Sequence, residues 1–227
     1  MLAKTKKTLF FLFLLTSLQV NAQSYLGLRS GLSFANVRTV NIETPEPGPD
    51  HINGINAALF VELGISKSFA IQPELNFLQK GYRVQEMFDG LTFDASVKLN
   101  YLELPILFKY RYGNPDAINI YAIAGPSLGY AYSGRFIDNT FDFSRAVDFE
   151  VDGEFGRVDV SAVIGAGANF PVGPGAIVFD LRYHFGLSSL LELDPNVEDT
   201  EKLQNRLLNI SIGYRIPIGS SGSSTSE

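Results

Sequence analysis

A histidine and several carboxylates stand at a spacing that could support acid–base chemistry. Asp180, Arg182 and His184 alternate along one segment, so on a β-strand their side chains share a face, and Asp159 lies in the preceding segment. A His–Asp pair can activate a serine in a hydrolase or acyltransferase. The candidate nucleophiles are Ser161 and Ser188. No motif ties either serine to the histidine, so the sequence favours a structural charge network with a histidine at its rim, and no catalytic site.

A second group of acids resembles a calcium-binding loop. Asp148, Glu150, Asp152 and Gly153 place carboxylates at alternate positions before a glycine, and Asp159 stands at the twelfth position. Calcium loops carry Asp or Asn at the third position and Glu at the twelfth, with a helix after them, and this run departs on all three counts. A solvated acidic loop is therefore the expected structure, with calcium as the open alternative. No cofactor is predicted.

The segments that must position these residues show a period of two. In segment 102–110, Leu102, Leu104 and Ile106 point to one face, while Glu103 and Lys109 point to the other. Strands are expected at residues 24–36, 53–66, 69–83, 97–111, 118–132, 157–170, 176–187 and 204–216. The fold class that follows is all-β: an eight-stranded, antiparallel, up-and-down transmembrane β-barrel.

The connections alternate in length, as in outer-membrane barrels. Residues 66–68, 112–117 and 171–175 are short and rich in Gly, Pro, Asn and Ser, whereas residues 37–52, 84–96, 133–156 and 188–203 are long. Short turns and both termini then face the periplasm. Pro73, Pro105 and Pro126 fall inside three consecutive strands of a barrel that has no edge, so a β-bulge is expected at each.

The second face of the strands decides which side meets lipid. It is rich in glycine and serine, with interspersed charges of both signs, and so fits the crowded lumen of a small barrel better than the water-facing surface of a soluble calyx. Buried charges must pair, which predicts a structural network in the lumen. Its expected members are Arg29, Glu62, Glu74, Glu103, Lys109, Arg111, Asp159, Asp180, Arg182 and Arg215, with Lys80 on the same face.

The ends of the chain point to export. Residues 1–22 combine three lysines, an apolar run and a final Val20-Asn21-Ala22, which predicts a cleaved signal peptide. The barrel domain is expected at residues 23–217, and residues 218–227 form a flexible Ser/Gly-rich tail. Without the leader the chain has 15 basic and 24 acidic residues, a net charge of −9, which excludes nucleic acid as a partner. The chain has no cysteine, so a lipid anchor and disulfides are excluded.

Several short motifs together resemble the PorT-like outer-membrane β-barrel family of Bacteroidetes-type bacteria. The most specific run is Asn100-Tyr101-Leu102-Glu103-Leu104-Pro105. The other matching runs are Gly27-Leu28-Arg29-Ser30-Gly31, Ile71-Gln72-Pro73-Glu74-Leu75, Lys80-Gly81, Ala124-Gly125-Pro126, Gly165-Ala166-Gly167, Asp180-Leu181-Arg182-Tyr183 and Ile212-Gly213-Tyr214-Arg215. The resemblance spans residues 24–217. It implies an eight-stranded barrel without an assigned activity, in a family named for a member that a protein-secretion apparatus needs.

The sequence thus predicts an integral protein of the outer membrane, in contact with its lipid, monomeric, not an enzyme, and filled by its own side chains. Its role is expected to be structural or partner-binding, toward a periplasmic or extracellular protein, with a link to secretion from the resemblance. Loop 133–156 carries five phenylalanines that could contact a partner, cover the barrel mouth or enter the lipopolysaccharide layer. A barrel enzyme and a small-solute channel are the alternatives.

Overall fold

The computed structural model describes residues 23–40, 50–88, 90–114, 117–150, 156–190 and 202–218. The strands are β1 (Ser24–Val40), β2 (Ile52–Gly64), β3 (Phe69–Phe88), β4 (Leu91–Tyr112), β5 (Asn119–Asp138), β6 (Phe143–Ala146), β7 (Val158–Val172), β8 (Gly175–Gly186) and β9 (Lys202–Ile218). Among these residues no helix is long and apolar enough to cross a membrane. The predicted leader and residues 219–227 lie outside the described part, whereas Ile218, expected in the tail, ends β9.

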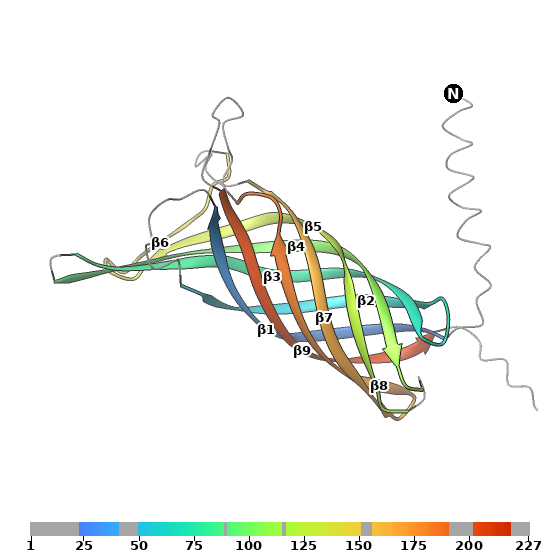
Figure 1. Ribbon diagram of the computed structural model, residues 1–227. Coiled ribbons are helices and arrows are strands. Elements are labelled where there is room, and N and C mark those ends of the chain that lie inside the picture. Colours follow the sequence, from blue (N-terminus) through green and yellow to red (C-terminus); the bar gives the residue numbers. More distant parts are fainter. Residues whose placement is uncertain are drawn as a thin grey trace, which may run out of the picture.

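Eight of the strands close into an antiparallel ring (Figure 1). Each pairs with its neighbours in the order β1, β2, β3, β4, β5, β7, β8 and β9, and the pairing of β9 with β1 closes the barrel. The predicted eight-stranded barrel is confirmed. The short β6 is additional: it pairs with β5 alone, at Arg135 to Asp138, beyond the ring.

The two faces of the strands meet different surroundings. The outward positions carry large hydrophobic side chains, as in β4, where Leu104 and Phe108 are exposed and Glu103 and Lys109 are buried. Paired aromatic rings lie outward near one end, where the Phe69 and Tyr110 centroids are 5.0 Å apart. An apolar belt with aromatic residues at its border is the surface that lipid requires, so the predicted orientation of the two faces is confirmed.

A row of polar side chains borders this belt on the side toward the connection between β3 and β4. The side-chain amide of Gln79 donates to Asn100 Oδ1 at 3.0 Å, and that of Asn100 donates to Ser133 Oγ at 2.9 Å. Next to this row, on the belt side, the rings of Phe77 and Tyr132 lie 6.4 Å apart. Strand residues beyond this row, on the side away from the apolar belt, therefore lie outside the membrane-spanning segments. Arg83 and Asp94 are among them.

The two ends of the barrel differ. We call the end with the β2–β3, β4–β5 and β7–β8 turns, together with Ser24 and Ile218, the short-turn end, and the opposite one the long-loop end. At the long-loop end the prediction of a loop at residues 84–96 is wrong. β3 and β4 continue as a ribbon that projects beyond the barrel, where Phe88 pairs with Leu91 and Gly90 between them has a φ of 81° (Figure 1). The expected loop 133–156 likewise begins as strand, because β5 runs to Asp138.

The three strand prolines cause gaps in the ladders, not bulges. Pairing of β3 with β4 passes from Pro73↔Ile106 to Asn76↔Glu103 without a change of register, and the same kind of gap flanks Pro126 between β4 and β5. Each gap follows from the missing proline N–H. The one register shift between β4 and β5 lies elsewhere, between Asn100 and Tyr101. The expectation of a bulge at each proline is therefore wrong.

Candidate functional site

The charged side chains of the inward face fill the lumen. All ten residues predicted for the network are buried, as are Lys80 and His184. The order of residues along β4 and β8 divides them into three layers. From the short-turn end these are a Glu62 layer (Glu62, Lys109, Arg111, Arg215), a Glu74 layer (Arg29, Glu74, Asp180, Arg182) and a Glu103 layer (Lys80, Glu103, Asp159, His184).

In the Glu62 layer one carboxylate meets three cations. Lys109 Nζ and Arg215 Nη1 both donate to Glu62 Oε2 at 2.8 Å, and Arg111 Nη1 donates to Oε1 at 2.9 Å. The cations also contact neutral groups, since Lys109 Nζ lies 3.7 Å from the ring centroid of Tyr121. The layer contains two more positive than negative charges.

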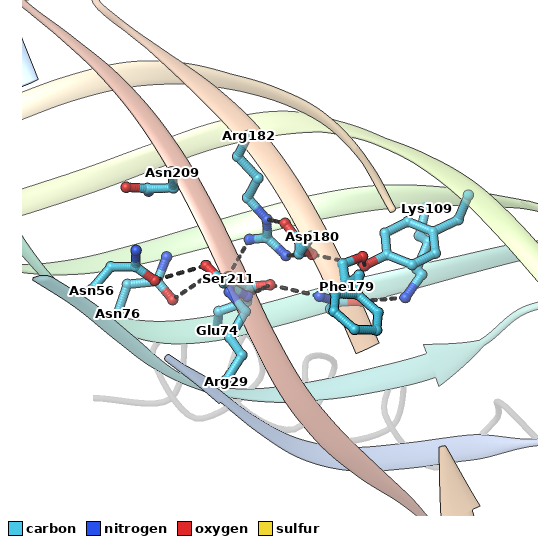
Figure 2. A network of polar contacts seen from close by, with 12 residues as sticks. Arg29, Asn56, Glu74, Asn76, Lys109, Phe179, Asp180, Arg182, Asn209 and Ser211 are labelled. Carbon is cyan, nitrogen blue, oxygen red and sulfur yellow. Dashed lines mark hydrogen bonds and ion pairs between the residues drawn. The ribbon is translucent and has the colours of Figure 1, made fainter. Parts of the chain in front are cut away.

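The Glu74 layer is balanced (Figure 2). Arg29 donates to Glu74 from both Nη atoms, at 3.0 and 2.9 Å, and Arg182 Nη1 donates to Glu74 Oε2 at 2.7 Å. Arg182 also holds Asp180, with Nε on Oδ1 and Nη2 on Oδ2. The Tyr121 hydroxyl donates to Asp180 Oδ2 at 2.8 Å. Two guanidinium groups therefore face two carboxylates, and every carboxylate oxygen accepts at least one hydrogen bond.

The Glu103 layer has one lysine between two carboxylates. Lys80 Nζ forms ion pairs with Glu103 Oε1 and with Asp159 Oδ2, the latter at 2.6 Å. Ser127 Oγ donates to Glu103 Oε2 at 3.1 Å, and His184 Nδ1 lies 3.4 Å from the same oxygen. This layer carries one net negative charge while the imidazole is neutral.

Sequence reasoning missed two apolar clusters in the same lumen. A mouth cluster at the long-loop end includes Leu78, Leu99, Tyr101, Val147 and Leu190, the last two from outside the strands. A second cluster, with Phe60, Leu107, Tyr121, Ile123, Val163 and Val178, lies nearer the short-turn end. The sequence contains a signal for these clusters. Apolar residues at inward positions, such as Leu99 and Leu107 in β4, interrupt the alternation of apolar and polar residues and give short runs that are apolar on both faces.

The structure separates the groups of the conjectured hydrolase. His184 is fully buried below the mouth cluster, so the expectation of a rim histidine is wrong. It faces Glu103 and not an aspartate, and Ser188 Oγ donates to Asp159 Oδ1 at 3.0 Å. The hydroxyl of Ser161 is buried and has no hydrogen-bond partner among the described residues. No serine–histidine hydrogen bond forms in the described part of the chain.

The acids of the conjectured calcium loop are likewise apart. Asp148 Oδ1 accepts the backbone N–H of Glu150 at 3.0 Å in an exposed turn, and Asp152 and Gly153 lie outside the described residues. Asp159 is inside the barrel, on Lys80. The described residues contain no group of three or more acids, histidines or cysteines arranged to hold a metal ion.

A family comparison places the chain. The model of the outer membrane protein beta-barrel domain matches residues 19–192, from the expected leader to beyond β8. The chain belongs to the outer-membrane protein β-barrel family. Outer-membrane localisation follows from this membership together with the closed ring and its apolar outer face. No curated protein matches the chain.

Solved structures of other outer-membrane barrels are similar to this family member in fold. Neisserial surface protein A is 12% identical, with a TM-score of 0.50, over 86% of this chain and 97% of that one. Ail of Yersinia pestis, solved with the heparin analogue sucrose octasulfate, is 18% identical with a TM-score of 0.42, over 86% and 99%. The N-terminal barrel domain of Pseudomonas aeruginosa OprF is 10% identical with a TM-score of 0.40, over 86% and 100%.

The long-loop end of this outer-membrane barrel presents apolar side chains to water. Phe136 and Phe149 pack against the mouth cluster, while Phe141 and Phe143 are exposed, and Phe155 lies outside the described residues. Leu91 and Met87, beside the ribbon turn, are 74% and 79% exposed. Of the three predicted uses of these aromatics, covering the mouth is the one that Phe136 and Phe149 show. His51, the other histidine of the chain, is exposed.

Proposed function

We propose that this barrel is a monomeric, closed outer-membrane protein that binds a polypeptide partner through its outer sheet. We define the outer sheet as residues 81–88 of β3, 91–98 of β4, 133–138 of β5 and β6. The observation that carries the proposal is the exposure of large apolar side chains on this sheet, well outside the lipid belt. Exposed apolar patches at such a distance from lipid mark interaction sites.

The register places three of these side chains on one face of the outer sheet. Leu91 pairs with Phe88 and Phe93 with Glu86, and Phe143 pairs with Asp138 across β5 and β6. Leu91 and Phe93 lie on the same side of β4 as the buried Val97. Phe143 lies on the same side of β6 as Arg145, whose guanidinium is 5.8 Å from the Phe136 ring. This face continues the inner wall of the barrel beyond the long-loop end. A partner bound to it would therefore extend the mouth cluster.

The outer sheet also has backbone edges, which favours a polypeptide as the partner. Among the described residues β6 pairs with β5 alone, and the upper part of β3 has β4 and one isolated bridge, Asp50↔Arg83. Open strand edges accept a further strand by main-chain hydrogen bonds, with side-chain pockets that give specificity.

The same architecture argues against the two alternatives. Eight strands leave a lumen that side chains can fill, and here buried ion pairs and the mouth cluster fill it, which opposes solute passage. His184 and the buried hydroxyls lie where substrate has no path, which opposes catalysis. The ten-residue network therefore acts as a structural plug. Planar-bilayer recordings are expected to show no stable conductance, and H184A no loss of lipid or peptide turnover relative to wild type.

The remaining features of the proposal come from the sequence. Residues 1–22 are removed on export, residues 23–217 form the barrel, the short turns face the periplasm, and the net negative surface repels nucleic acid. The resemblance to PorT-like barrels supports a narrower version, in which the chain belongs to that subgroup and its partner is a component of a secretion apparatus.

Site-specific photocrosslinking in intact outer membranes tests the proposal. A photoreactive residue at Glu86, which pairs with Phe93 and so shares the face of Leu91 and Phe143, is expected to give a discrete adduct that L91S combined with F143S reduces at least tenfold. The matched control is the same probe at Lys67, in the β2–β3 turn at the opposite end, which is expected to give no such adduct. An adduct of equal yield in the L91S/F143S background, or none at Glu86, would contradict binding by this sheet.

A further inference from the structure

A cavity opens in the lumen at the short-turn end. Its volume is about 170 Å³, well above the roughly 10–15 Å³ that one water needs. Tyr25, Ala176, Arg215 and Pro217 line it from inward-facing positions of β1, β8 and β9. Gln23 and the β7–β8 turn, with Pro171, Gly173, Pro174 and Gly175, form the rest of the wall. The mouth cluster closes the other end of the lumen, so this cavity is the approach to the Glu62 layer from outside the barrel.

Arg215 is the cation that this cavity reaches. Its side chain is fully buried, and its guanidinium lies 3.8 Å from the ring centroid of Tyr25, another residue of the cavity wall. Nη1 donates to Glu62 Oε2 at 2.8 Å. Nε and Nη2 are also buried and have no acceptor among the described residues. The guanidinium is therefore held by one ion pair and one aromatic face, and two of its buried donors have no acceptor among the described residues.

Those two donors form one edge of the guanidinium, and the same edge binds carboxylates elsewhere in this chain. Arg182 uses Nε and Nη2 to hold the two oxygens of Asp180. Arg83 uses Nε and Nη2 to hold the two oxygens of Asp94. Two parallel N–H groups match the spacing of oxygens in a carboxylate or a phosphate, and this geometry explains the frequency of arginine in sites for both.

The charge of the layer favours an anion at that edge. Lys109, Arg111 and Arg215 share Glu62 as their carboxylate, so the layer has an excess of two positive charges. An excess of buried charge is costly unless a counter-charge approaches it. In the neighbouring Glu74 layer the protein supplies that counter-charge with Asp180.

We propose that the Nε/Nη2 edge of Arg215 binds an oxyanion, a carboxylate or phosphate group that enters through the cavity at the short-turn end. The chemistry recognised is a pair of oxygens with at least one negative charge. The group could belong to a free phosphate or to the terminal carboxylate of a peptide, and both present such a pair. This site is separate from the outer sheet and does not depend on partner binding there.

Titration of the full-length protein purified in detergent micelles tests the proposal. Inorganic phosphate, acetate, and a short glycine peptide with a free terminal carboxylate are added separately, each against sodium chloride of equal ionic strength. Calorimetry is expected to show saturable binding of at least one of them. The Nε–H resonance of Arg215 in a ¹⁵N spectrum is expected to shift with the same midpoint. The amidated form of the peptide separates a carboxylate source from the peptide chain itself.

R215K keeps the charge but removes the paired donors, so affinity is expected to fall at least tenfold. The matched control is R206K, on the same strand, where Arg206 donates to the carbonyls of Gly186 and Asn205 at the long-loop end and binding is expected to be unchanged. Equal affinity in R215K would overturn the proposal. The spectrum of wild type remains decisive even where R215K does not fold, because an Arg215 Nε–H resonance that responds to chloride alone also overturns it.

Discussion

Arg182 and Arg215 are two buried arginines on adjacent strands, and they differ in how many of their guanidinium nitrogens have a hydrogen-bond acceptor. Arg182 has an acceptor for Nε, Nη1 and Nη2, from Asp180 and Glu74. Arg215 has an acceptor for Nη1 alone, from Glu62, among the described residues. The residue type is the same, and the local ratio of cations to carboxylates decides the outcome. Within the proposed plug, the Glu74 layer is balanced in charge, whereas the cation-rich Glu62 layer lies beside the cavity, as the proposed oxyanion site requires.

Loss of Glu62 is expected to have the largest effect on this contrast. E62Q leaves Lys109, Arg111 and Arg215 in a buried layer without a carboxylate, which is expected to lower the free energy of unfolding by about 5 kcal/mol. The chain has no tryptophan, so unfolding in denaturant is followed by circular dichroism. E86Q, at an exposed position of the outer sheet, is the control and should match wild type. A loss below about 1 kcal/mol in E62Q would mean that the layer is hydrated and its charges are screened.

The two arginines can be compared directly by the same substitution. R182M leaves Asp180 and part of Glu74 as unpaired buried charges and is expected to cost about 4 kcal/mol. R215M removes one of two surplus charges while Glu62 keeps Lys109 and Arg111, so its cost is expected to stay under about 1 kcal/mol. Equal losses in the two variants, measured by the same unfolding transition, would break the distinction between plug and site.

The closed and open ends of the lumen can be compared through the mouth cluster. Leu99 is fully buried there, and L99A is expected to lower the free energy of unfolding by about 3 kcal/mol, because it leaves a cavity among apolar side chains. L104A, on the lipid-facing side of the same strand, is the control and is expected to cost less. If L99A is the milder change, then the long-loop end is not sealed by packing, and the difference between the two ends disappears.

The fold was accessible from the sequence because the strands alternate over most of the length where lipid and lumen differ most. Leu102 to Tyr112 alternates in this way apart from the inward Leu107, and Glu103 and Lys109 are buried as the pattern predicts. Charge ratios within a layer were not accessible, because they depend on strand stagger, which brings Glu62 of β2 to Arg215 of β9. The prediction that His184 lies at the rim was wrong for a similar reason. Val147 and Leu190, from segments without strand periodicity, cover the lumen between His184 and the long-loop end. The ribbon at residues 84–96 was predicted as a loop because polar residues such as Gln85, Glu86 and Asp94, with Gly90 among them, resemble a loop in composition, although Leu91 and Phe93 share one face.

Arg83 and Asp94 repeat the Arg182–Asp180 pairing in water and so give the smallest expected effect. Hydrogen bonds from the Arg83 guanidinium, with Nε 2.7 Å from Oδ1, hold the pKa of Asp94 below its ordinary value. A lowered folded-state pKa contributes stability that is present above the ordinary aspartate pKa, near 4, and is lost as pH falls through the folded value. Amide hydrogen exchange in residues 84–94 is therefore expected to accelerate, after correction for intrinsic rates, below about pH 4. D94N should show faster exchange at neutral pH and no such step, while amides at Asp180, where the same pair is buried, should remain protected throughout. A step of equal size in D94N would assign the change to another group and leave the exposed pair without a measurable role.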